Sequence, residues 1–194
     1  YVHLKNMKTL KIFILFLAVS IPLSCQTNQQ GFIKVDEIHS RARHVALLYF
    51  ANHTNNPQAG KIVTDLMSSE LYTVPDFQMM EQSAIHEKLK KSKHYDDDYL
   101  ESVLDNISAR EIGKLLGVDT VIFGSVSEYR YKMDLSEVPA VGINIRLLDV
   151  ESGEILWTAS KSQTGNNSWF LKDSLNSLAQ KTCRKLVKSI SKPR

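Results

Sequence analysis

The sequence is poor in the motifs on which enzymes depend. It has no Gly-x-x-x-x-Gly-Lys loop to cradle a phosphate and no Gly-x-Ser-x-Gly turn to present a nucleophile. The histidines beyond residue 25 show no metal-ligand spacing such as His-x-x-x-His. The acidic run at 96–98 has neither the alternating ligands nor the turn glycine of a calcium loop. We therefore expect no metal, no cofactor and no catalytic residues, and we do not expect an enzyme.

Charge of one sign is also lacking once the first 24 residues are set aside. Those residues hold three of the 24 lysine and arginine residues and none of the 21 acidic residues, so 21 of each sign remain. A balanced chain has no overall electrostatic attraction for nucleic acid, and we expect no such partner. A length of about 170 residues suits one domain with its own core.

The C-terminal segment is an exception to this balance. Seven basic residues and one acid, Asp173, lie between Lys172 and Arg194. Such a helix either presents a solvated outer face or contacts anionic lipid or a charged wall polymer. The first interpretation is favoured, because the apolar face of the same helix is needed to cover a sheet.

What the chain does have is an export signal. Lys8 and Lys11 are followed by an apolar run from Ile12 to Val19 and by small residues just before Cys25. The run is too short to cross a bilayer as a helix, which takes roughly 20 residues. A cysteine directly after this pattern resembles the acylated residue of a bacterial lipoprotein. The other interpretation is a plain secretory leader that ends beside a cysteine.

These features predict three segments. Residues 1–24 form a signal peptide whose true start is Met7, residues 25–43 form a lipidated N-terminus and flexible tether, and residues 44–191 form the folded domain. Two acyl chains, such as palmitate, anchor a protein firmly. Gln26, where some lipoproteins carry an aspartate, indicates the periplasmic face of the outer membrane by analogy with Gram-negative sorting.

The two cysteines then have separate roles. With Cys25 acylated, Cys183 has no partner within the chain, so no internal disulfide can form. Apolar residues surround Cys183 at helical spacing, which predicts a buried structural thiol rather than a reactive one.

Hydrophobic periodicity predicts an α/β fold. The expected order is β-α-β-α-α-β-β-β-α, which gives one mixed sheet of about five strands packed with about four helices. We expect strands at 44–50, 77–80, 120–131, 142–150 and 155–160, and helices at 59–72, 83–91, 108–117 and about 169–190.

A hairpin is the clearest local prediction. Ile143, Ile145 and Leu147 alternate with Asn144 and Arg146, so the two sets face opposite sides of a strand. The turn at 151–154 contains a glycine suited to positive φ, and the returning strand places Ile155, Trp157 and Ala159 on one face. Upstream, Ser108 and Glu111 have the spacing of a capping box for a helix that ends at Gly117.

Four stretches together resemble the CsgG family, which is named for the curli secretion channel and includes many outer-membrane lipoproteins. They are Val45–Phe50 with the following Asn52–Thr54, Ala109–Asp119, Val121–Val126 and Leu147–Trp157. The peptidoglycan-synthase activator LpoB is a relative with a similar core, and the N-terminal domain of TolB has a similar fold. These motifs are structural, so they identify a fold better than an activity.

The resemblance implies a lipid-anchored, non-catalytic periplasmic protein that binds other envelope proteins in an outer-membrane assembly or secretion complex. An LpoB-like activator of a peptidoglycan synthase is the first alternative, and a ring-forming channel subunit is the second. The second is disfavoured, because the connections at 132–139 and 163–170 are too short for membrane hairpins, whose strands need roughly 9–11 residues each. A homo-oligomer is a further alternative that the sequence leaves open.

Five residues are candidates for partner contact. Met133, Trp169 and Phe170 belong to the two shortened connections, and Asn144 and Arg146 belong to the polar face of the hairpin. Exposed apolar side chains beside polar ones suit interfaces. For Trp169 and Phe170 the alternative is that they fix the start of the last helix on the sheet.

Replacing the acceptor cysteine tests the anchor. Wild-type protein from cell membranes should carry acyl groups on Cys25 by mass spectrometry, and Cys25→Ser should lose them and leave the membrane fraction. An unmodified Cys25 in wild-type protein, or wild-type protein free in the cytosol, would contradict the prediction.

Overall fold

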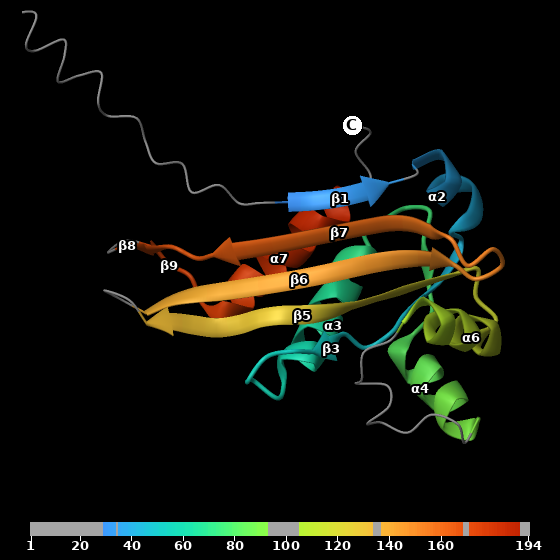
Figure 1. Ribbon diagram of the computed structural model, residues 1–194, viewed down its shortest axis with the longest axis horizontal. Helices are drawn as coiled ribbons and strands as arrows, with labels where there is room; N and C mark the ends of the chain where they lie inside the picture. The colour runs from blue at the N-terminus through green and yellow to red at the C-terminus, as the bar shows by residue number, and fades with distance from the viewer. Residues whose placement is uncertain (1–28, 34, 93–104, 134–136, 169–170, 191–194) are drawn as a thin grey trace, which may run out of the picture.

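One mixed β-sheet organises the chain (Figure 1). The computed structural model describes residues 29–33, 35–92, 105–133, 137–168 and 171–190. Seven strands pair in the order β1-β7-β6-β5-β2-β4, with β3 beside β5. A separate short pair is formed by β8 and β9. Their bounds are β1 Gln29–Ile33, β2 His44–Leu47, β3 Ala51–Asn52, β4 Gln78–Met79, β5 Thr120–Met133, β6 Glu137–Asp149, β7 Ile155–Thr164, β8 Asn167–Ser168 and β9 Leu171–Lys172.

The long central strands pair antiparallel, β5 with β6 and β6 with β7. β1 pairs with the other edge of β7 and is also antiparallel to it. On the other side, β2 and β3 lie one after the other along β5 and parallel to it. β4 extends this parallel part beyond β2. The sheet is therefore mixed, as the sequence predicts.

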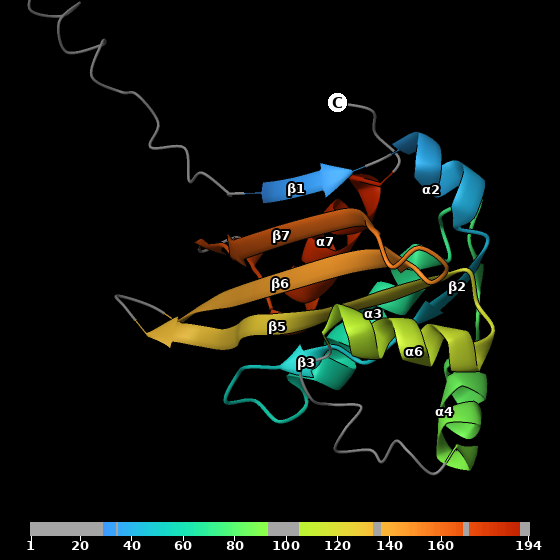
Figure 2. The same cartoon turned by 45° about the vertical axis from the view of Figure 1, so that its right-hand side comes forward.

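Helices cover the two faces of the sheet unequally. α3 (Ala59–Leu71) and α7 (Leu175–Lys188) pack on one face, and α4 (Gln82–Lys91) and α6 (Asn106–Leu116) pack on the other. A further helix, α2 (Val35–Arg41), contacts β7. Figure 2 shows α6 in front of one end of the sheet and α7 behind it.

Among the described residues, no helix is long and apolar enough to span a membrane.

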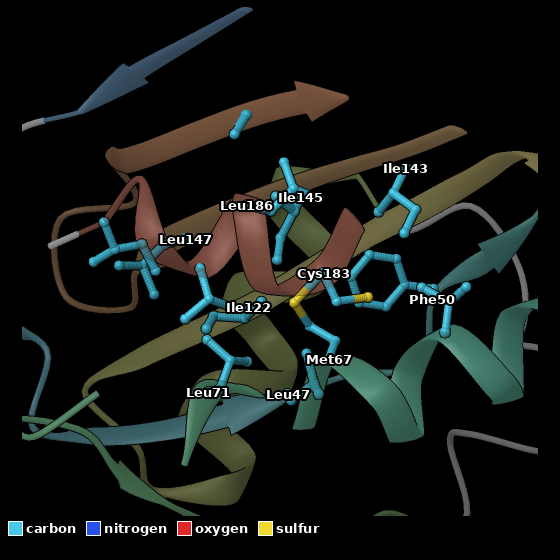
Figure 3. Packing of buried hydrophobic residues seen from close by; sticks show 14 of the residues in the cluster. Leu47, Phe50, Met67, Leu71, Ile122, Ile143, Ile145, Leu147, Cys183 and Leu186 are labelled. Carbon is cyan, nitrogen blue, oxygen red and sulfur yellow. The ribbon is translucent and has the colours of Figure 1, made fainter. Parts of the chain in front are cut away.

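The larger core lies under α3 and α7 (Figure 3). Side chains of the sheet, such as Ile122 and Ile145, meet Met67 from α3 and Leu186 from α7. Cys183 is buried in the same cluster, as predicted, and burial raises the pKa of its thiol to about 12. A thiol with so high a pKa is not a nucleophile at neutral pH.

The N-terminal part of the fold differs from the sequence expectation. The sequence places residues 29–33 and 35–41 in a flexible tether, but they form β1 and α2. Ile38 on α2 is buried in the larger core. The polar composition of Gln26–Gly31 hides the strand, because an edge strand pairs through its backbone and needs no apolar alternation.

The predicted hairpin is present, with one correction. Ile143, Ile145 and Leu147 are buried, while Asn144 and Arg146 face the other side. Ile155 does not share a face with Trp157, because Leu148 pairs with Ile155 and Leu147 with Trp157, which leaves Leu156 as an extra residue. This bulge turns Ile155 toward the smaller core under α6.

Helix α6 also begins earlier than its sequence pattern indicates. Asp105 is the N-cap, and its carboxylate accepts a hydrogen bond from the Ser108 amide at 2.7 Å. That hydrogen bond lowers the pKa of Asp105. The predicted capping box at Ser108 is therefore wrong, since Ser108 lies within the first turn. The predicted end is confirmed, because Gly117 has φ of 72° and caps the helix.

Close approach to an aromatic ring requires a glycine in β5. A Cβ atom on Gly124 would lie 2.7 Å from Cε1 of Phe50 and 2.1 Å from the Asn144 carbonyl oxygen. Neither neighbour can retreat easily, because Phe50 is buried and the carbonyl belongs to the adjacent strand. The Phe50 ring thus packs directly on the backbone of β5.

Gly124→Ala should therefore destabilise the protein by about 3 kcal/mol or more, in the upper range for overpacked sites. Gly117→Ala is the matched control, because its Cβ meets no atom within 4 Å and only its φ is strained, at about 1–2 kcal/mol. Urea unfolding measures both. Equal losses for the two variants would show that neither the Phe50 ring nor the Asn144 carbonyl constrains Gly124.

Candidate binding surface on the uncovered sheet face

The face of the sheet opposite α3 and α7 is only partly covered. At one end Val121, Phe123 and Leu148 are buried beneath α4 and α6. Further along the same strands, the side chains change to Ser125, Asn144 and others with hydroxyl groups. Both ribbon views show no helix in front of the left-hand part of β5, β6 and β7 (Figures 1 and 2). We call this region the polar sheet face: Ser125, Asn144, Arg146, Thr158 and Ser160. The buried ring of Phe123 borders it.

The first row of this surface centres on Asn144. Cross-strand pairing aligns Ser125 on β5, Asn144 on β6 and Ser160 on β7. The Ser160 hydroxyl donates to Asn144 Oδ1 at 2.6 Å, and Asn144 Nδ2 donates to Ser125 Oγ at 3.4 Å. The amide group is therefore held between two hydroxyls and forms a fixed polar floor.

The second row centres on Arg146. Its cross-strand neighbours are Phe123 on β5 and Thr158 on β7. The guanidinium carbon lies 5.9 Å from the centroid of the Phe123 ring, within the range of a cation–π contact. Nη1 donates to Oδ1 of Asn106, the first residue of α6, at 3.4 Å. The start of α6 thus fixes the charged end of Arg146.

A hollow of about 240 Å³ lies between the two rows. His53, from the loop after β3, lines it together with the polar sheet face, and no acidic residue does. A second hollow of about 340 Å³ also borders His53 and includes Glu128 and Arg130. There Glu128 pairs with Arg130 at 3.0 Å and with Lys132 at 3.4 Å. Of these two hollows, only the first is free of carboxylates.

Internal hydrogen bonds hold the loop that carries His53. Asn52 Oδ1 accepts from the Thr54 amide at 3.0 Å and from the Thr54 hydroxyl at 2.8 Å. Asn52 Nδ2 donates to the Asn56 carbonyl oxygen at 2.7 Å. The asparagines of this loop therefore shape its backbone and position the rim of the hollow.

A larger hollow, of about 740 Å³, lies at the opposite end of the sheet, near α2 and the β6–β7 turn. Its charges are of both signs, and some of them are paired within the protein. Asp119 accepts from the His44 amide at 2.9 Å and lies 3.0 Å from His44 Nδ1. Burial raises the pKa of Asp119, but these hydrogen bonds outweigh it and the pKa is lowered. Asp149 accepts from the amide and hydroxyl of Ser152.

The described residues contain no metal centre to compete with the polar sheet face. Within that part of the chain, no group of three or more histidine, cysteine or acidic residues could hold a metal. The buried thiol of Cys183 is unreactive, as described above. The hydrogen-bonded side chains of the polar sheet face are suited to binding.

The candidate contact residues fall in different places. Asn144 and Arg146 lie in adjacent rows of the polar sheet face. Met133 ends β5, and its side chain is not described. Cys25, Trp169 and Phe170 lie outside the described residues. Phe123, Asn106 and Ser160 were not expected, because they join the site only through the register of neighbouring strands and the start of α6.

The basic helix α7 favours the solvated interpretation. Arg184 makes hydrogen bonds of 3.1–3.3 Å to the carboxylate of Glu70 on α3, and Lys181 lies 2.5 Å from Asp173. These two basic residues therefore serve the fold. The apolar side of the helix, including Leu178, covers the sheet.

Comparison with known proteins adds a family match. The model of the family described as peptidoglycan-synthase activator LpoB matches residues 27–162. No curated protein matches the sequence. This finding supports the expected relation to LpoB, whereas nothing found supports the resemblance to the CsgG family.

Three solved structures illustrate proteins with a similar fold. PelC of Paraburkholderia phytofirmans, solved as a dodecamer, is 21% identical over 87% of this chain and 100% of its own, with a TM-score of 0.57. Lipoprotein GNA1162 of Neisseria meningitidis is 18% identical over 76% and 97%, with a TM-score of 0.56. The LpoB C-terminal domain of Salmonella enterica is 16% identical over 66% and 91%, with a TM-score of 0.50. At such identities the likeness shows the fold alone.

The polar sheet face should contribute little to folding. Arg146→Ala removes an exposed cation–π contact and should change the free energy of unfolding by about 1 kcal/mol or less. Phe123→Ala should cost about 3–5 kcal/mol, because the ring is 2% exposed and packs under α6. Urea unfolding compares them. A loss at Arg146 as large as that at Phe123 would make Arg146 a structural residue.

Proposed function

Since the chain belongs to the family of the peptidoglycan-synthase activator LpoB, we propose that it binds a peptidoglycan synthase and raises its activity without catalysing a reaction itself. The family match over residues 27–162 carries this proposal, because the matched part contains the whole polar sheet face. A polar surface with fixed side chains and no catalytic group suits a binding role.

Activation by binding has a simple thermodynamic form. A protein that binds the active conformation of an enzyme more tightly than the inactive one raises the active fraction. The fixed rows of the polar sheet face suit this role, since little side-chain ordering opposes association. Met133, Trp169 and Phe170 stay proposed as a second contact.

We propose that a lipid on Cys25 places this activator at the periplasmic face of the outer membrane. Gln29, the first residue of β1, is only four positions after Cys25. A fully extended chain covers about 14 Å over that distance. With β1 paired to β7, the folded body is therefore held closer to the membrane than a tether reaching residue 43 would hold it.

A ring-forming subunit is the second candidate. One observation favours it: among the described strands, β1 has a partner only on its β7 side, so its outer edge is open to another chain. The PelC neighbour was solved as a dodecamer. Light scattering on purified lipidated protein separates the candidates, since an activator can act as a monomer and a ring subunit cannot.

A glycan polymerisation assay tests the main proposal. Adding the wild-type protein to a peptidoglycan synthase from the same cell should raise its rate several-fold. Arg146→Glu should need about tenfold more protein for the same rate, as for a residue at the centre of an interface. Lys61→Glu, a charge reversal at an exposed position on α3, should behave as the wild type.

Two results would count against the proposal. A synthase rate that wild-type protein leaves unchanged, under conditions where both proteins are folded, would remove the activator function. Equal losses in Arg146→Glu and Lys61→Glu would mean that general charge, and not the polar sheet face, governs the effect.

A further inference from the structure

Arg146 has binding capacity that the folded chain does not use. Arg41, Arg130 and Arg184 each pair with a carboxylate, at 3.5, 3.0 and 3.1 Å. Among the described residues no ion pair includes Arg146, whose side chain makes one hydrogen bond, to the neutral amide of Asn106. A guanidinium group has five N–H donors in a fixed fork. Most of these donors are therefore available at the hollow.

The guanidinium group is also held in place before any partner arrives. The Phe123 ring supports it on one side and Asn106 holds one end. Phe123 is itself locked under α6, so its position does not depend on a ligand. A charged group fixed in this way loses little conformational entropy on binding, which strengthens each hydrogen bond that it forms.

The hollow has the size of a side chain. Its volume of about 240 Å³ is below the range of about 300–1,000 Å³ typical of small-molecule and cofactor sites. Its floor offers the Ser125 hydroxyl in the row next to Arg146, and no acidic residue of the described part of the chain lines it. Size and charge together favour one acidic side chain reaching in from a bound surface.

Resting on the function proposed above, we propose that this hollow receives an aspartate or glutamate side chain of the bound synthase. The carboxylate pairs with Arg146 through the two parallel N–H···O bonds that guanidinium groups form with carboxylates. The Thr158 and Ser160 hydroxyls already donate to the Ile145 carbonyl oxygen and to Asn144 Oδ1. The Ser125 hydroxyl accepts from Asn144 Nδ2, so its own proton can be donated to a carboxylate oxygen. Arg146 then selects a partner that carries an acid at this point of the interface.

Zero-length cross-linking tests for the carboxylate directly. Carbodiimide joins an amine to a carboxylate with loss of water, so Arg146→Lys should introduce a new cross-link from position 146 to an aspartate or glutamate of the synthase. Arg43→Lys, at an exposed position before β2, is the matched control and should give no such product. Mass spectrometry of the digested complex identifies the acid. A complex that forms without any cross-link from position 146 would overturn the inference.

Binding measurements separate this inference from the function on which it rests. Arg146→Ala should weaken synthase binding about tenfold and Arg146→Glu more, while Arg146→Lys should stay within several-fold of wild type because it keeps the charge. Replacing the identified acid by lysine should restore binding of Arg146→Glu. Wild-type affinity in Arg146→Glu would refute the carboxylate pairing and leave the function standing. Failure of the wild-type protein to bind any synthase would refute both.

Discussion

The register of β5, β6 and β7 is the constraint on which the rest of the structure depends. Side chains alternate across each strand, so a slip of one residue would exchange the two faces. Ile122, Ile145 and Trp157 would then face solvent, while Asn144 would be buried beneath α7 without water. Burial of apolar side chains against α3 and α7 excludes this alternative, since each is worth about 1.5–3 kcal/mol. The same register aligns the two rows of the polar sheet face.

Features of the fold can be predicted from the sequence when the interactions that produce them join residues close together in the chain. Alternation along 142–160 was enough to place Asn144 and Arg146 opposite the core, and Gly117 was enough to mark a helix end, because both signals lie within a few residues. β1 was missed because its pairing with β7 joins residues far apart in the chain. The bulge at Leu156 was missed for a related reason, since the strand itself carries no sign of an extra residue.

The site was predictable only in part. The sequence supplied Arg146 as an exposed polar residue of a hairpin but not the groups that hold it. Phe123 has the pattern of an ordinary buried strand residue, and its role beside Arg146 depends on strand pairing. Asn106 contributes because α6 starts at residue 106, earlier than the apparent capping box at Ser108 indicates. Sequence patterns also favoured the CsgG family, because short strand and helix motifs are shared among relatives of one fold.

A guanidinium group at the centre of an interface serves selectivity more than affinity. Removing Arg146 and a partner carboxylate from water costs free energy. Their mutual attraction offsets part or all of that cost. The cost is modest here, because Phe123 and Asn106 already take the place of some water around Arg146 before binding. A partner with an apolar group at this point would bury the unpaired charge, which costs far more than a lost contact. Under the proposed function, the hollow on the polar sheet face would therefore discriminate among proteins that meet this domain, and this discrimination would come from the same strand register that builds the core.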